Sequence, residues 1–103
     1  MELRDYLIIL YDYYCELLDE DDRMYFEYYY FDNLSLAEIA ENNNVSRNAV
    51  HKHIKNTTSK LKFYESKLNL YDKDKKLEKR IKAIKDETIK EVVIKIVNFD
   101  KKI

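Results

Sequence analysis

The sequence predicts an all-α protein, a helix-turn-helix bundle with long C-terminal helices, and three observations support this fold class. The 103 residues include neither glycine nor proline, so helices can run without interruption. Apolar residues recur every three or four positions through most of the chain, which is the helical period. Two such patterns meet at an asparagine triplet, residues 42–44. The missing glycines also exclude P-loops, dinucleotide-binding turns and EF-hand loops, which need glycine where the backbone turns sharply.

The first helix is expected over residues 3–18, where leucine and tyrosine recur at helical spacing. This helix is apolar on almost every side, so we expect a neighbouring subunit to cover part of it. The lone Cys15 has apolar neighbours, which favours a buried and inert thiol.

Four consecutive acidic residues, 19–22, suit the start of a second helix over residues 21–31. Carboxylates there cap free amides and interact favourably with the helix dipole. A metal site is the less favoured interpretation, because the four acids lack the spacing of a ligand loop. The many rings of this helix are expected to fill the core. Stacking on unpaired bases would need basic residues among the rings, and only Arg23 is near.

The helix-turn-helix motif is expected over residues 35–56. Ser35 and Glu38 are spaced as a capping box, which starts a short helix. Asn44 can adopt the left-handed conformation needed for the turn, and Val45 after it is expected to be buried. The positions that pack the two helices together are Ile39, Ala40, Val45 and Val50.

A long helix follows over residues 46–69, with Ser46 as its cap and one inward stripe that begins at Val50. The opposite face then carries side chains that can donate to guanine, pair with adenine edges and contact phosphates in a major groove. The helix start can also hold a phosphate through its free amides. The candidate nucleic-acid-binding residues are Ser46, Arg47, Asn48, His51, Lys52 and Lys55.

The last helix is expected over residues 73–98, capped by Asp72, with an apolar stripe on one side. Acidic residues on its polar face disfavour a lipid anchor and favour packing against the helix at 46–69 or against another subunit. The expected organisation is therefore a helical domain, residues 1–71, followed by an amphipathic helix at 72–98.

Charge divides the chain into an acidic and a basic part. Residues 1–45 hold 12 acidic and 2 basic side chains, whereas residues 46–64 hold five basic side chains and no carboxylate. This asymmetry is expected when one surface meets a polyanion and another does not. For the lysines beyond residue 72, which alternate with acids, a solvated helix face is the better explanation.

The motif resembles region 4 of the bacterial sigma factors, through the aliphatic pair Ile39-Ala40 and the run Val45-Ser46-Arg47. More closely, residues 6–71 are similar to the YlxM family (UPF0122) of small helix-turn-helix proteins. The resemblance implies an all-helical fold, DNA binding, and a link to the signal recognition particle pathway, because the family's genes lie beside those of the particle's GTPases. The matching segments include Tyr11 to Tyr14, Leu17-Leu18, Tyr28-Tyr29, Leu34 to Leu36, Glu38 to Glu41, Ala49-Val50 and Ile54-Lys55.

Two positions depart from the motif. Asn43 stands where a large apolar residue is usual, and His53 stands where sigma-type motifs have an aliphatic one. We expect Ile54 and the preceding helix to fill the space. This packing sets the angle at which the second helix is presented. The run His51-Lys52-His53 also departs from the pattern expected of the family, so the sequence preference on DNA need not follow relatives.

The residues give no support for catalysis or for a cofactor. His51 and His53 point about 200° apart on a helix, so they cannot chelate one metal ion from one chain. No glycine-flanked nucleophile is present. We expect no enzyme activity, no cofactor and no metal.

The resulting hypothesis is a homodimeric, DNA-binding regulator of transcription whose partner is double-stranded DNA, with signal recognition particle components as a further possible partner. The alternative is a non-enzymatic accessory factor that binds a protein or ribonucleoprotein, such as that particle, through its acidic part. No signal-peptide pattern or long apolar stretch stands out, so we expect a cytoplasmic protein without membrane insertion.

Overall fold

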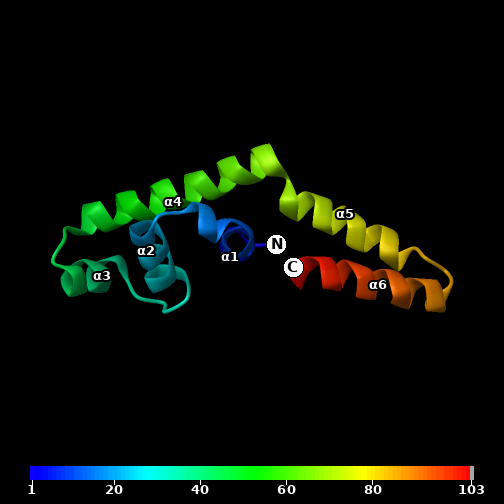
Figure 1. The fold of residues 1–103 in the computed structure, drawn as a ribbon. Coiled ribbons are helices and arrows are strands. Elements are labelled where there is room, and N and C mark those ends of the chain that lie inside the picture. The colour runs from blue at the N-terminus through cyan, green and yellow to red at the C-terminus, as the bar shows by residue number, and fades with distance from the viewer. Residues whose placement is uncertain (103) are drawn as a thin grey trace. The chain divides into compact units, whose positions relative to one another are not determined.

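The structure, a computed structural model, describes residues 1–102, with side chains up to residue 100. This range contains six α-helices and one 3-10 turn but no strand, so the all-α prediction is confirmed (Figure 1). The elements are α1 Leu3–Tyr14, η1 Cys15–Leu17, α2 Glu20–Tyr30, α3 Leu36–Asn43, α4 Arg47–Leu68, α5 Leu70–Lys82 and α6 Glu87–Lys102.

The chain divides into two compact units, Met1–Asn69 and a second that begins at Leu70. In the first unit the long α4 lies across α1, α2 and α3 and contacts all three (Figure 1). Burying one large apolar side chain fully contributes roughly 1.5–3 kcal/mol, so the core where these helices meet dominates the stability of this unit. Its fully buried side chains are Leu10, Tyr14, Phe26, Ile39, Val50, Thr57 and Leu61.

The first helix is shorter than predicted, because α1 ends at Tyr14 and a 3-10 turn follows. Leu18 has extended backbone and its side chain is buried, so the chain leaves the helix in order to place this leucine in the core. Asp19 then caps α2, and its carboxylate accepts from the Asp22 amide at 2.8 Å. The capping role predicted for the acidic cluster is confirmed. Cys15, predicted to be buried, is half-buried.

Asparagine provides the left-handed turns in this glycine-free chain. The residues with positive φ in the described structure are Asn33, Asn44 and Asn69, at 56°, 53° and 54°. Asn44 and Asn69 cap the ends of α3 and α4. Asparagine tolerates this conformation better than other residues with a Cβ atom.

The second unit corrects the prediction of one continuous helix over residues 73–98. The chain instead forms α5 and α6, which contact each other. Asp86 explains the break, because its Oδ1 accepts from the amides of Thr88 and Ile89 at 2.9 and 3.1 Å and so caps a new helix. Asp72, predicted as the cap, lies inside the first turn of α5 and pairs with Lys76 at 3.0 Å.

The α6 helix keeps an exposed apolar stripe. Four side chains at helical spacing, Ile89, Val92, Ile96 and Phe99, are each more than half exposed. No helix in residues 1–102 is long and apolar enough to cross a membrane.

Candidate nucleic-acid interface

The short α3 is fixed at both ends by the interactions expected from its sequence. The Ser35 hydroxyl accepts from the Glu38 amide, and the Glu38 carboxylate accepts from the Ser35 amide, both at 3.1 Å. At the other end Asn44 is left-handed, and the Val45 amide donates to the Ala40 carbonyl at 3.1 Å. These contacts set where α4 begins.

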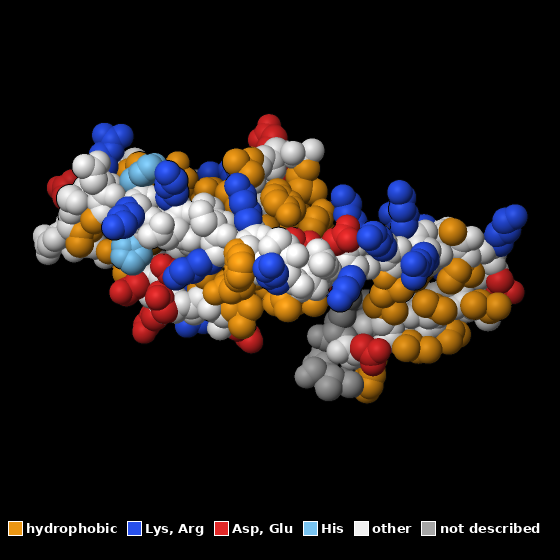
Figure 2. Space-filling view, turned by 90° about the horizontal axis from the view of Figure 1, so that it is seen from above, with side chains coloured by type: hydrophobic (Ala, Val, Ile, Leu, Met, Phe, Trp, Pro, Cys, Tyr) orange, Lys and Arg blue, Asp and Glu red, His pale blue; other side chains and the backbone are white. Residues whose placement is uncertain are grey.

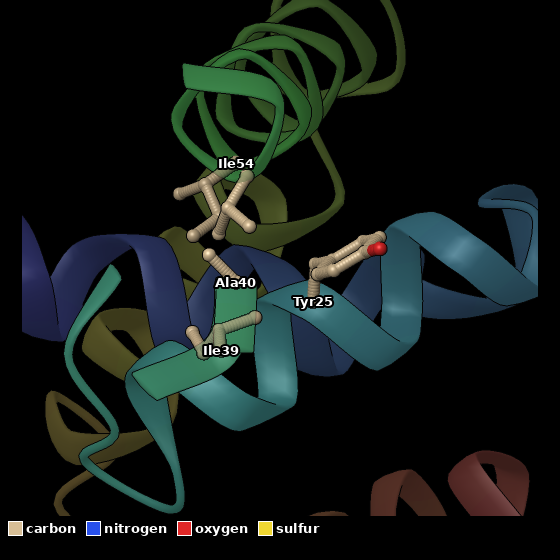
Figure 3. Close-up of a cluster of buried hydrophobic side chains, with 5 residues drawn as sticks. Tyr25, Ile39, Ala40 and Ile54 are labelled. Atoms are coloured by element: carbon tan, nitrogen blue, oxygen red, sulfur yellow. The ribbon is translucent and has the colours of Figure 1, made fainter. Parts of the chain in front are cut away.

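A small buried cluster joins α3 to α4. Ile39 and Ala40 of α3 pack against Val50 and Ile54 of α4, with Tyr25 of α2 as the fifth member. Figure 3 shows Ala40 lying between Ile54 and Ile39, with the Tyr25 ring beside them. The small Ala40 lets the two helices approach closely.

The prediction that Val45 is buried is wrong, since its side chain is 39% exposed. Tyr25 belongs to the cluster in which Val45 was expected, so α2 completes the core next to the turn. Packing predicted from the motif alone did not include this third helix.

The six candidate residues lie together at the start of α4 and are all exposed. The Ser46 hydroxyl accepts from the Ala49 amide at 3.0 Å, so Ser46 is the predicted cap. Arg47 to Lys55 spans roughly 12 Å along the helix axis at 1.5 Å per residue. Figure 2 looks down on α4 and shows lysine, arginine and histidine side chains spread over this side of the helix. The exposed residues are Ser46, Arg47, Asn48, His51, Lys52 and Lys55.

The electrostatics of this face follow from the helix and from its composition. Three of the six side chains are permanent cations, and α4 has no acidic residue in its first turn. The helix N-terminus adds a partial positive charge and free amides. The free amides at the start of this face can therefore hold a phosphate, and its side chains can donate to base edges and to phosphates.

The edge of the buried face of α4 carries a group of polar contacts with α2 that the sequence analysis did not find. Asp22 of α2 is buried, and its Oδ2 accepts from Lys60 Nζ at 2.6 Å. His53 Nδ1 lies 3.5 Å from Asp22 Oδ1, and the His53 ring lies over Tyr25 with 4.8 Å between centroids. This arrangement explains the departure at His53, because the imidazole packs on a ring and faces a carboxylate.

The contact between Asp22 and Lys60 shifts the pKa values of both groups. Burial alone would raise the pKa of the Asp22 carboxyl, but hydrogen bonds with Lys60, Thr57 and His53 and the Lys60 charge lower it below its usual range. The hydrogen bond to Asp22 likewise raises the pKa of Lys60. The signal in the sequence was the spacing of His53, Thr57 and Lys60, at i, i+4 and i+7 on one face of the helix. This spacing does not identify Asp22 as the partner, because Asp22 lies 38 residues away from Lys60 in the sequence.

The second departure also has a local explanation. Asn43 is half-buried, and its side-chain amide donates to the Ile39 carbonyl at 2.8 Å. The polar side chain thus finds a backbone acceptor four residues earlier in α3, so it can be half-buried without losing a hydrogen-bond partner. Elsewhere, the described side chains include no group of three or more histidine, cysteine or acidic residues placed to hold a metal ion.

The capped short helix, the asparagine turn and the long helix with an exposed basic face define a protein of the helix-turn-helix class. A family model described as "Putative helix-turn-helix protein, YlxM / p13 like" matches residues 1–99. The chain belongs to this family, UPF0122. The resemblance recognised in the sequence is confirmed, and it extends beyond residues 6–71.

Bacterial relatives support the assignment. A UPF0122 protein of Clostridium botulinum is 49% identical over 81 residues, which are 79% of this chain and 74% of the relative. One from Clostridium kluyveri is 48% identical over 86 residues, 84% of this chain and 78% of the relative. One from Fusobacterium nucleatum is 40% identical over 84 residues, 82% of each chain.

Proposed function

We propose that this protein is a non-enzymatic, DNA-binding regulator that places the first half of α4 in the major groove of duplex DNA. The observation that carries the proposal is the exposed basic face at the capped start of α4. An α-helix fits the major groove, which is about 12 Å wide. The helix-turn-helix class uses its second helix in this way.

Each residue of the face has a proposed role. Arg47 and Asn48 lie nearest the helix start and would read base edges, with arginine suited to guanine and asparagine to adenine. Lys52, Lys55 and His51 would contact phosphates. Ser46 and the adjacent free amides would hold a further phosphate.

The proposal includes a homodimer and a regulatory role. A two-fold dimer would present two α4 helices to successive major grooves, about 34 Å apart. Exposed apolar side chains on α6 favour association. The family resemblance suggests the signal recognition particle pathway as the process that is regulated.

Fluorescence anisotropy with labelled genomic duplex fragments tests the proposal. Neutralising about five phosphates gives a slope of roughly −4 to −5 for log affinity against log salt. The double variant Arg47→Ala and Lys52→Ala is expected to weaken binding by about tenfold or more, since a base contact is worth roughly 1–3 kcal/mol. The matched control is Lys79→Ala with Lys82→Ala, which removes two exposed lysines of α5 and should leave affinity nearly unchanged.

Two outcomes would contradict DNA reading by α4. One is an absence of duplex binding even at low salt, which favours an accessory factor that binds a protein or ribonucleoprotein. The other is an equal loss in both double variants, which indicates attraction to charge without a defined site.

A further inference from the structure

A groove lies between α1 and α2, away from the basic face of α4. Its volume is about 770 Å³. Tyr11 and Cys15 line it from the α1 side, and the rest of its wall comes from α2 and the residues just after it. Its α2 side includes residues 20, 24, 27 and 31, at the spacing of one helix face. A helix of 11 residues rises roughly 17 Å, so the groove follows about three helical turns.

The apolar part of the groove is a packed aromatic surface. The Tyr11 ring stacks on Phe26, with 4.5 Å between centroids, and meets Phe31 edge to face at 5.6 Å. Phe31 is 45% exposed and Met24 is half-buried. Rings that are held in place lose little conformational freedom on binding, and methionine adapts to varied apolar partners.

The polar part of the groove is acidic. Glu20, Glu27 and Asp32 line it and are exposed, whereas Arg23 is the single cation in the lining. Burial, together with the charge of Glu27 and a hydrogen bond to it, raises the pKa of Tyr11 to about 12. Such a rim repels a nucleic-acid phosphate and attracts lysine and arginine.

We propose that the groove binds a basic amphipathic helix of a partner protein, with apolar side chains on Met24 and Phe31, which the buried Tyr11 ring supports, and cations at the acidic rim. Charge complementarity selects this occupant, since the three carboxylates would repel an acidic helix and would gain no charge contact from an uncharged one. The mode is a helix laid into a groove. The site goes beyond DNA reading and does not depend on it, because its lining contains no residue of α4.

The chain contains natural reporters for this site. It has one cysteine, Cys15, and two methionines. Cys15 and Met24 line the groove, while Met1 is 78% exposed at the N-terminus and lies outside the lining. Alkylation of the thiol and the methyl NMR signals of ¹³C-labelled methionine therefore report occupancy in the unmodified chain, with Met1 as an internal reference.

The experiment titrates the full chain with a synthetic helical peptide of leucine and lysine, about 14 residues long so that it spans the whole groove. We expect a saturable shift of the Met24 methyl signal, an unchanged Met1 signal and slower alkylation of Cys15 by iodoacetamide. A peptide of the same length with glutamate in place of lysine should have none of these effects.

Charge reversal in the groove then tests the assignment. Glu20→Lys with Glu27→Lys is expected to lower the affinity for the peptide by about tenfold or more, because like charges across an interface repel each other. The matched control, Glu2→Lys with Glu41→Lys, makes the same charge change at exposed positions outside the lining and should leave the affinity within a few-fold. If the reversed protein loses helical circular dichroism, Glu20→Gln with Glu27→Gln removes the charge while keeping the side-chain size.

Three results would overturn the proposal. In the first, the groove variant and the control variant weaken peptide binding equally, which means that the peptide is attracted by net charge without a defined site. In the second, the peptide binds without moving Met24 or protecting Cys15. In the third, no peptide binds and the groove reversal dissociates a dimer, which would make a second copy of this chain the occupant.

Discussion

Asn44 carries the left-handed turn between α3 and α4, with φ 53° and ψ 43°. The left-handed conformation costs a residue with a Cβ atom roughly 1–2 kcal/mol, and the cost is lower for asparagine because its side chain can interact locally. The angle at which α4 is presented therefore depends on a residue type that accepts this backbone without much strain.

Replacing Asn44 by alanine is expected to lower the free energy of unfolding by about 1 kcal/mol, whereas Asn44→Gly should be neutral or stabilising. Urea denaturation followed by circular dichroism measures both changes. The control is Asn42→Ala, at an exposed position inside α3, which should have little effect because alanine is a good helix former. An equal loss at both positions would contradict strain at the turn as the cause.

The Asp22–Lys60 pair makes stability depend on pH in a defined direction. Because the folded-state pKa of Asp22 is lowered, its contribution is fully present above the unfolded value of about 3.9 and is lost as pH falls through the folded value. The raised pKa of Lys60 makes its contribution present at neutral pH and lost as pH rises above the ordinary lysine value.

We expect Asp22→Asn to lower the free energy of unfolding at pH 7 by roughly 1–3 kcal/mol, below the loss typical of a fully buried pair because Lys60 is partly exposed. The difference from the unmodified chain should shrink as pH falls below about 4. The neighbouring exposed Asp21 supplies the control Asp21→Asn. A gap between Asp22→Asn and the unmodified chain that stays constant down to pH 2 would exclude the pair as its source.

The role of Asn44 was predicted from the sequence, whereas the contact of Asp22 was not, and the reason is how far apart the interacting residues are. The turn and the caps at Ser35 and Ser46 depend on neighbours within four residues, and all three are as predicted. The Asp22–Lys60 contact joins residues 38 positions apart, so it depends on how α2 meets α4. The spacing of residues within one helix contains no information about how two helices pack against each other.

At the level of elements, α4 has one face for the core and another for solvent. Val50, Ile54, Thr57 and Leu61 are buried, while the six candidate site residues are exposed. The sequence predicted this division because a helical stripe needs only the period of the helix. It did not predict the exposure of Val45, which depends on Tyr25 from α2.

Two valines near the turn should therefore respond differently to truncation. Val50→Ala is expected to cost about 2 kcal/mol, because it leaves a cavity at a fully buried position. Val45→Ala should cost less than about 0.5 kcal/mol, as is usual for surface changes. Urea denaturation of the two variants measures both changes in the free energy of unfolding. An equal loss at Val45 and Val50 would mean that Val45 is part of the buried core.

The second unit marks where element prediction failed. The apolar period continues from α5 into α6, so it favoured a single helix, whereas the side chain of Asp86 bonds two amides ahead of it and starts a new one. An aspartate inside a periodic stretch can lie on the polar face or cap a helix, and the period does not distinguish these cases.

For the whole molecule, the proposed dimer should involve the exposed stripe of α6. We expect light scattering to give twice the mass of one chain, and Val92→Lys with Ile96→Lys to give a single chain, because two cations would be buried without partners. Glu91→Lys with Asn98→Lys adds lysines to exposed positions on another face of α6 and should leave the dimer intact. A monomeric unmodified chain would exclude the dimer, and a dimer that survives the first pair would exclude this stripe.

The division of α4 into an inner and an outer face has a practical consequence for redesign. Since no candidate DNA contact belongs to the buried stripe, the five outer positions after Ser46 can be exchanged as a set, while Ser46 is kept as the cap of α4 and the hydrophobic scaffold stays the same. The first unit would then serve as a frame for interchangeable reading surfaces. A grafted set should redirect the preferred base sequence and leave the melting temperature nearly where it was.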